Sequence, residues 1–208
     1  MLDPATRQVA DHDLLDLDVL EVADGDLLAD WTFERCRFAG ADLPGLVTHR
    51  VTFSACEFTN TDLAGSRHDG SAFTNCRFPG ANLATASFSG CKLTGTDLSG
   101  ARLLALEVDG GDWSWTNLRQ CDLSGRSLGG VRLAHADLDA ADLSDADLSG
   151  ADLSDANLRH ADLSGADLRG ARIDRAVFDD AVLTGTRIDL GIAVALARAR
   201  GAEVDPTA

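Results

Sequence analysis

The five cysteines are the residues whose spacing most directly tests for metal or redox chemistry. They are Cys36, Cys56, Cys76, Cys91 and Cys121. A zinc site typically uses C-x-x-C pairs, and a closed disulfide framework needs an even number of cysteines. Neither condition is met, because the chain has no C-x-x-C and an odd cysteine count. Free cysteine packs as a small hydrophobic residue, so we expect buried thiols, no metal and no cofactor.

His68 is the strongest candidate for acid–base chemistry, because almost all equivalent positions in the chain are apolar. Catalysis would need a concave site in which further polar groups converge. The sequence has no Ser/His/Asp order, Gly-rich phosphate loop or metal-ligand spacing. We therefore expect a core histidine that is hydrogen-bonded to the backbone or to Thr48, in a protein that is not an enzyme.

The element that carries these residues is a five-residue repeat. From Leu28 to Ile188 every fifth residue is large and apolar, with Thr48 and His68 as exceptions. The residue two places before each centre is usually small, and the residue two places after it is often Gly. A period of five fits neither a helix nor a flat strand, and instead indicates a small unit that is stacked many times.

A second period of 20 residues sets the shape of the stack. Phe33, Phe53 and Phe73 follow it, and the two exceptions are also 20 residues apart. Four pentapeptides per coil predict an all-β solenoid, a quadrilateral β-helix of about eight coils and about 39 Å in length. The large and small positions point inward, and Gly after each centre suits a turn with positive φ. Because no repeat is interrupted, we expect no projecting loop between residues 28 and 188.

Charge is the main functional signal. The formal charge is −16, which disfavours direct binding of nucleic acid. No apolar run approaches 18 residues, so we expect a cytoplasmic protein. Nine acids and three arginines lie between Val131 and Gly170. One column of residues 20 apart is predicted to form an acidic stripe; it contains Asp42, Asp62, Asn82, Asp122, Asp142 and Asp162, with Arg102 as the exception.

Two explanations of these acids remain open. Asp and Asn hydrogen-bond readily to backbone at turns, which accounts for the residue type. Duplex DNA carries about 23 charges over about 39 Å, and a net charge of −16 on such a rod is about two-thirds of that density. The rod would then present a DNA-like field to a protein with a basic DNA groove.

The ends differ from the repeats, and we divide the chain into residues 1–27, 28–189 and 190–208. In the acidic first segment, alternation in residues 15–19 predicts a capping strand, and residues 3–12 are expected to be disordered. In the last segment a short α-helix is expected, with Asp189 as its N-cap and Gly201 at its end. Its apolar face predicts either a cap for the last coil or a dimer contact.

The irregular stretch LVTHRVTFSACEFTNTDLAGSRHDGSAFTNCRF (residues 46–78) resembles the mycobacterial fluoroquinolone-resistance (MfpA-type) group of pentapeptide repeat proteins. The tail RIDLGIAVALARARG (residues 187–201) resembles the C-terminal dimerisation segment of that group. These proteins and the plasmid Qnr-type proteins are similar dimeric, right-handed β-helices that mimic DNA. The resemblance therefore implies right-handed coils.

The resemblance also implies partners. They are DNA gyrase or topoisomerase IV, which the protein would inhibit or protect from fluoroquinolones or related toxins, and a small GTPase as a second partner. The acidic surface expected to bind gyrase is Asp137, Asp142, Asp147, Asp152, Asp162 and Asp167. The expected homodimer interface is Leu190, Ile192, Ala193, Val194, Leu196 and Ala197.

Two other functions remain as alternatives. The first is a general protein-interaction module that uses a flat face or the outward Trp115. The second is a carbohydrate-acting β-helix enzyme, which is disfavoured because such sites need loops and the repeats leave no room for them.

Overall fold

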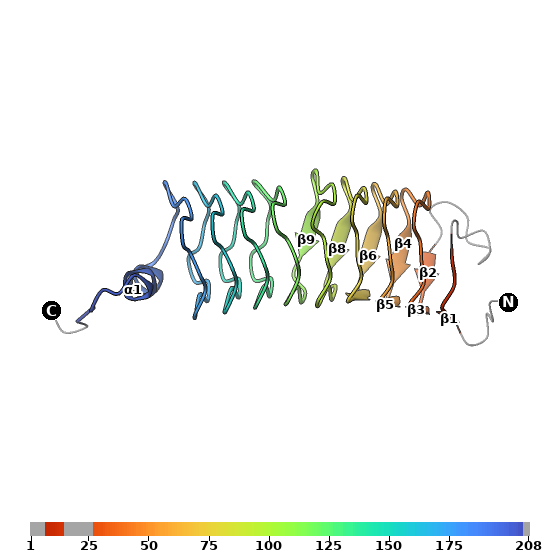
Figure 1. Ribbon diagram of the computed structural model, residues 1–208, viewed down its shortest axis with the longest axis horizontal. Coiled ribbons are helices and arrows are strands. Elements are labelled where there is room, and N and C mark those ends of the chain that lie inside the picture. Colours follow the sequence, from red (N-terminus) through yellow and green to blue (C-terminus); the bar gives the residue numbers. More distant parts are fainter. Residues whose placement is uncertain (1–6, 15–26, 206–208) are drawn as a thin grey trace.

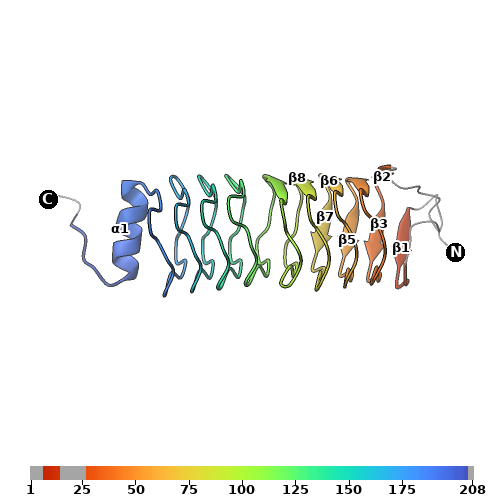
Figure 2. The same cartoon turned by 90° about the horizontal axis from the view of Figure 1, so that it is seen from above.

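The computed structural model describes residues 7–14 and 27–205 and shows a rod of stacked coils that ends in one helix (Figures 1 and 2). The helix α1 is Leu190–Ala199. The strands are β1 (Gln8–Ala10), β2 (Leu27–Ala29), β3 (Thr32–Glu34), β4 (Val47–His49), β5 (Thr52–Ser54), β6 (Arg67–Asp69), β7 (Ala72–Thr74), β8 (Ser87–Ser89) and β9 (Glu107–Asp109).

Residues 20 apart pair in parallel along the rod. One sheet has the order β1-β3-β5-β7 and the other β2-β4-β6-β8-β9. Single bridges continue the same spacing on the other faces and in the later coils, as in Asp142↔Asp162. At this spacing residues 28–188 form about eight coils. The right-handed quadrilateral β-helix with a short C-terminal helix, as predicted from the sequence, is confirmed.

The interior is a set of stacked side-chain ladders. The rings of Phe38, Phe58 and Phe78 stack with centroids 4.7 and 4.6 Å apart, and Phe33, Phe53 and Phe73 form a parallel ladder beside them. All five cysteines are buried and free. The Cys56 thiol donates a hydrogen bond to the carbonyl of Phe33, so the small inward positions also link successive coils.

Each pentapeptide ends in a corner with positive φ. This conformation occurs two residues after every repeat centre, at Gly125 (φ 63) and equally at Ala140 (φ 57). Gly is the natural residue here, but many corners hold Asn, Asp, Ala or Arg instead. The corner geometry therefore comes from the coil as a whole and not from glycine alone.

The N-terminal segment differs from expectation. Residues 7–12 were expected to be disordered, but β1 pairs with β3, and Val9 lies beside Phe33. Val9 and Leu14 are buried and five residues apart, so residues 7–14 add part of a coil in a shifted frame. The prediction is wrong because Val9 and Leu14 lie outside the main five-residue register, in a frame shifted by one residue. The strand predicted at residues 15–19 lies outside the described residues.

Candidate protein-interaction surfaces

Aspartate before a repeat centre has a structural role at most turns. The carboxylate of Asp142 accepts hydrogen bonds from the amide and the hydroxyl of Ser144, two residues later. Asn performs the same function, since the side-chain oxygen of Asn82 accepts a hydrogen bond from the backbone amide of Ala84. The residue type is therefore explained by the turns, and any binding role depends on which carboxylates remain without a basic partner.

The six acids predicted to bind gyrase do not lie on one face. The bridges place Asp142 and Asp162 in one ladder and Asp147 and Asp167 in a second. Asp137 lies in a third ladder and Asp152 in a fourth. We name the four faces of the rod after Asp137, Asp142, Asp147 and Asp152, in chain order.

The Asp152 face is electrically balanced. Its outward ladder reads Lys92, Asp112, Arg132, Asp152, Arg172. Arg172 lies 3.5 Å from Asp152, and Arg132 lies 3.6 Å from Asp112. On the Asp137 face, Asp137 accepts hydrogen bonds from the guanidinium of Arg119 and from the side-chain amide of Asn157. Both faces therefore carry acids whose charge is already compensated.

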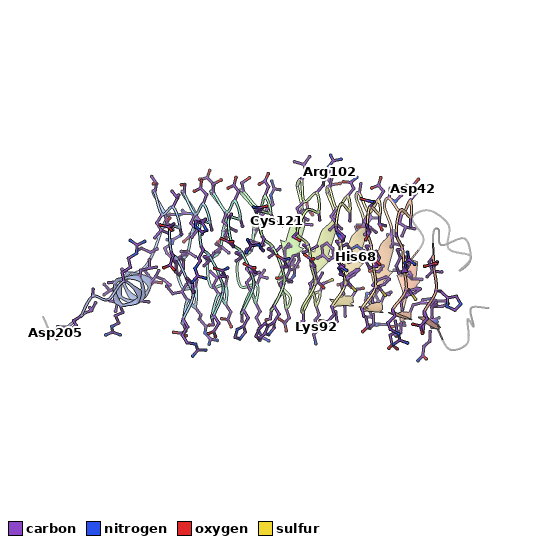
Figure 3. The ribbon with its side chains drawn as sticks, in the orientation of Figure 1. Asp42, His68, Lys92, Arg102, Cys121 and Asp205 are labelled. Carbon is purple, nitrogen blue, oxygen red and sulfur yellow. The ribbon has the colours of Figure 1, made fainter. Side chains whose placement is uncertain are left out.

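The Asp142 face is different. Its ladder is Asp42, Asp62, Asn82, Arg102, Asp122, Asp142, Asp162 and Val182, on the side of the rod away from Lys92 (Figure 3). In the described part of the chain, no basic group lies within 4.0 Å of Asp122, Asp142 or Asp162. Each of these three carboxylates uses one oxygen to cap its turn. We call this three-residue row the acidic face.

The acidic face continues round one corner of the rod. Asp145 occupies the corner with φ 56, and Asp147 begins the next face. Both are exposed, and neither has an ion pair among the described residues. Hydrogen bonds from the hydroxyl and then the amide of Ser149 lower the pKa of Asp147, and those from Ser124 and Ser164 lower the pKa of Asp122 and Asp162 in the same way. These groups are therefore ionised at neutral pH.

Asp167 does not belong to this surface. It is 4% exposed, and its carboxylate lies 2.7 Å from Arg169 and 3.2 Å from Arg187. The hydrogen bond from the Arg169 side chain and then that from its amide hold the pKa of Asp167 well below its ordinary value. The prediction that it lies on an open acidic surface is wrong, because the arginines of neighbouring positions cover it.

The helix α1 closes the C-terminal end of the rod. Asp189 accepts the amide of Ile192, so the predicted N-cap is confirmed. Ile192 is 4% exposed and belongs to the core, and Leu196 packs against it. These two residues of the predicted dimer interface therefore cover the protein's own last coil. Leu190 is 81% exposed, and Val194 is partly exposed on the remaining surface.

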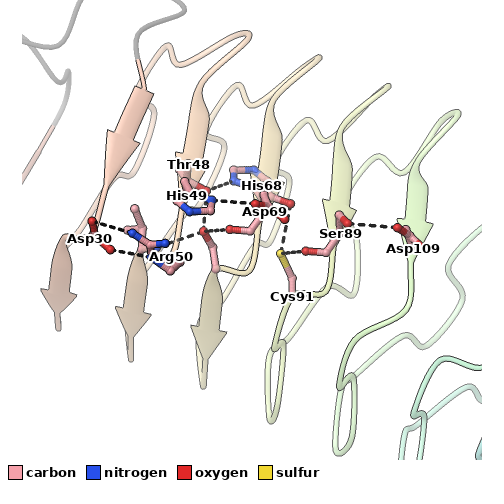
Figure 4. Close-up of polar contacts among 11 residues, drawn as sticks. Asp30, Thr48, His49, Arg50, His68, Asp69, Ser89, Cys91 and Asp109 are labelled. Carbon is pink, nitrogen blue, oxygen red and sulfur yellow. Dashed lines mark hydrogen bonds and ion pairs between the residues drawn. The ribbon is translucent and has the colours of Figure 1, made fainter.

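The remaining candidates for chemistry lie in the core or on the corner of the rod. His68 is 2% exposed and hydrogen-bonded to Thr48, as expected (Figure 4). Trp113 is a core residue, whereas Trp115 is 60% exposed and stacks on the ring of His135 at 3.9 Å. Among the described residues, no cluster of His, Cys, Asp and Glu could hold a metal ion. No helix in that part of the chain is long and apolar enough to cross a bilayer.

Comparison with known proteins agrees with this architecture. The profile of pentapeptide repeats matches residues 116–155 and 151–188, and that of the pentapeptide repeat region matches residues 28–103. The chain therefore belongs to the pentapeptide repeat family.

Solved structures give the same fold. One is a trypsin-treated M102R form of QnrB1, a plasmid-mediated fluoroquinolone resistance protein, with a TM-score of 0.80 and 22% identity over 95% of this chain and 97% of that one. Another is HetL, a pentapeptide repeat protein involved in heterocyst differentiation regulation in the cyanobacterium Nostoc sp. strain PCC 7120; its TM-score is 0.55, with 24% identity over 86% of each chain. No curated protein sequence matches the chain.

Proposed function

We propose that this protein is a non-enzymatic DNA mimic that binds the basic DNA-binding groove of DNA gyrase or a related type II topoisomerase in the cytoplasm. The observation that carries the proposal is the row of carboxylates that form no ion pair among the described residues, Asp122, Asp142 and Asp162, with Asp145 at the adjoining corner and Asp147 on the next face. The fold is similar to that of QnrB1, a plasmid-mediated fluoroquinolone resistance protein.

The spacing of these charges suits such a groove. Successive coils of stacked strands are about 4.8 Å apart, so the acidic face carries one carboxylate per about 4.8 Å. Phosphates along one DNA strand are spaced at about 3.4 Å of helix axis. Asp145 at the corner and Asp147 on the next face add further charges beside this row. A rigid rod holds the charges in place, so little side-chain entropy is lost when a basic groove closes on it.

We further propose that two rods join at their C-terminal ends, so that the acidic faces extend along a longer dimer. Leu190, Ala193, Val194 and Ala197 remain at least partly exposed on α1 and supply the apolar contact. Ile192 and Leu196 support this surface from beneath by fixing the helix to the last coil. The repeat region, residues 28–189, would then bind the enzyme, and the helix would set the dimer. A small GTPase as a second partner stays a prediction.

The test is supercoiling of relaxed plasmid by purified gyrase, with and without a fluoroquinolone, across a series of salt concentrations. A DNA mimic inhibits supercoiling or rescues it from the drug, and the effect weakens steeply as salt rises. Absence of any effect on an actinobacterial gyrase would contradict the proposal and favour a general interaction module, with Trp115 as its first contact to test.

A further inference from the structure

The rod is split between two of its coils. In regular coils, each repeat centre donates its amide to the next coil, as Leu83 does to Arg102 at 2.9 Å and Leu123 to Asp142 at 2.8 Å. No backbone hydrogen bond joins residues 101–110 to residues 121–130, all of which lie in the described part of the chain. The ladder resumes where Arg132 donates to the carbonyl of Gly111.

The split leaves backbone groups unpaired along two successive faces. The amides of Leu103, Ala105, Val108 and Gly110 have no backbone acceptor in the next coil, although their equivalents one coil earlier do. In Figure 1 the coil that carries β9 stands visibly farther from the next coil, along the upper edge, than other neighbouring coils do. A cleft of about 310 Å³ opens there, and its lining includes Leu103, Leu104, Cys121 and Asp122.

Two oversized residues at positions that are usually small and inward account for the split. The inward ladder that contains Ala86, Ala146 and Ala166 holds Leu106 and Arg126 at two successive places. Stacked strands are about 4.8 Å apart, which leaves too little depth for leucine and arginine one above the other. Solvent accordingly reaches Ala101 and Val108, inward residues whose counterparts in the neighbouring coils, such as Ala81 and Phe88, are buried.

Arg126 gives the split a charge preference. It is partly exposed, and its Nε donates to the carbonyl of Ser124 at 3.0 Å. No carboxylate lies within 4.0 Å of its guanidinium among the described residues. Arg102 and Asp122 occupy positions 20 residues apart on one face, but no bridge joins them across the split and they form no ion pair. Arg102 lines the cleft together with Asp122, and Arg126 lies close enough to Asp122 to add to the lowering of the pKa of that carboxyl by the Ser124 hydrogen bonds. Because neither arginine has a carboxylate within 4.0 Å, each guanidinium can still take an ion pair from an anionic occupant.

We propose that this split is a second docking site, which binds an extended acidic peptide segment of a partner protein. The segment adds as a strand to the unpaired backbone of residues 103–110 and places a carboxylate against Arg126. Main-chain hydrogen bonds supply affinity and the side-chain pairing supplies specificity, as in other cases of strand addition to an open sheet edge. The site shares only Asp122 with the acidic face, and it would persist if gyrase were not the target.

The experiment uses the whole protein and measures amide hydrogen exchange by NMR. The probe is the acetylated and amidated peptide ADLSDADLSG, which is acidic and has the length of two pentapeptides. Without peptide, we expect the amides of Leu103, Ala105 and Val108 to exchange at least about 100-fold faster than those of Leu83, Thr85 and Phe88. With 1 mM peptide, exchange at the split should slow at least about tenfold.

Two control peptides separate strand pairing from charge attraction. A peptide with every backbone amide N-methylated cannot donate to the carbonyls of the edge, and its methyl groups keep its own carbonyls from approaching the unpaired amides, so it should give no protection. A peptide with Asn in place of each Asp should bind at least about fivefold more weakly. Equal protection by the N-methylated peptide, or none by the parent peptide, would overturn the proposal. Protection that rises with protein concentration alone would show that a second copy occupies the split, and would overturn it too.

A double variant tests the cause of the split. Leu106→Ala with Arg126→Ala places alanine where Ala86 and Ala146 already stack, and should let the two coils close. The amides of Leu103, Ala105 and Val108 should then become protected without peptide, and the peptide response should disappear. Arg126→Ala alone, which leaves Leu106 in the core, should weaken binding of the acidic peptide. Undiminished peptide binding by both variants would contradict the assignment.

Discussion

The hydroxyl of Thr48 lies 2.8 Å from Nδ1 of His68, one coil along the same inward ladder (Figure 4). These are the only two polar residues at the centres of the repeats, and each is the hydrogen-bond partner of the other. Nε2 of His68 contacts the hydroxyl of Ser66 at 2.9 Å, and Thr48 also contacts Ser71. The polar pair is therefore satisfied within the core and has no access to a substrate.

This burial makes the stability of the rod depend on pH. Burial lowers the pKa of His68 from its ordinary value of 6.5 to about 3. Below pH 6.5 the unfolded chain binds a proton that the folded chain does not, so this contribution to stability is full above pH 6.5 and falls towards pH 3. We expect a loss of about 2 kcal/mol in the free energy of unfolding between pH 6.5 and pH 5 from this residue.

The measurement is urea unfolding at both pH values for the wild type and for His68→Phe. The aspartates titrate in both proteins and cancel in the comparison. Between pH 6.5 and pH 5 the free energy of unfolding of the variant should fall by about 2 kcal/mol less than that of the wild type. This difference does not depend on the stability of the variant at neutral pH. An identical pH dependence in the two proteins would mean that His68 is protonated in the folded state.

Gly111 is required where the chain returns from the split to its regular register. Its φ is 102°, and a Cβ atom there would lie 2.3 Å from the carbonyl oxygen of Cys91. We expect Gly111→Ala to cost about 3 kcal/mol or more, because strain and a backbone clash combine. The neighbouring Gly110→Ala is the control, since nothing lies near that position and Ala105 has a similar φ.

Gly110→Ala should cost about 1 kcal/mol or less in the same urea titration, through backbone conformation alone. Equal losses for the two variants would show that the return to register does not depend on the approach of Gly111 to Cys91. A Gly111→Ala variant whose free energy of unfolding is almost unchanged would lead to the same conclusion.

The two sides of α1 have different predicted roles. Leu190→Asp with Val194→Asp should convert a dimer to a monomer with less than about 1 kcal/mol lost from the stability of the rod, because these side chains lie on the outer surface. Ile192→Asp should instead destabilise the docked helix by several kcal/mol, because it places a charge in the core.

Sedimentation velocity measures the oligomeric state, and thermal unfolding measures the stability. A wild type that is monomeric at micromolar concentration would contradict dimerisation through α1. A dimer that survives the outer double substitution would place the interface elsewhere on the rod.

Much of the fold follows from the sequence because its periods are uninterrupted. The spacing of Phe33, Phe53 and Phe73 predicts the coil length, and the stacked rings confirm it. The site is harder to predict, because residues in one acidic run point to four faces. Asp137 and Asp142 are five residues apart, yet their charges are compensated on one face and open on the next.

The sequence carries a signal for the split that the five-residue period alone does not reveal. Leu106 and Arg126 are 20 residues apart at a position that is usually small, and Arg126 is its only charged occupant between residues 31 and 186. A repeat pattern is assessed one sequence position at a time. Packing in the core depends instead on which side chains stand at the same position one coil before and one coil after. The shifted frame of Val9 and Leu14 was missed for a related reason, since neither residue belongs to the main register.

The most direct test of the DNA-mimic account compares two matched triple variants in the gyrase supercoiling assay. The first is Asp122→Asn, Asp142→Asn and Asp162→Asn, on the acidic face. The second is Asp112→Asn, Asp137→Asn and Asp152→Asn, on two other faces, where each of these carboxylates already has an arginine partner. Each changes the net charge of −16 by three units, and Asn keeps the turn hydrogen bonds, as Asn82 and Asn117 do.

We expect the first triple variant to need at least about tenfold more protein than the wild type for half-inhibition of supercoiling, which corresponds to a loss of about 1.4 kcal/mol in binding free energy. The second triple variant should need within about twofold of the wild-type concentration. Circular dichroism should show that both remain folded. Equal inhibition by the wild type and both variants, or equal loss in the two variants, would contradict a role for the acidic face.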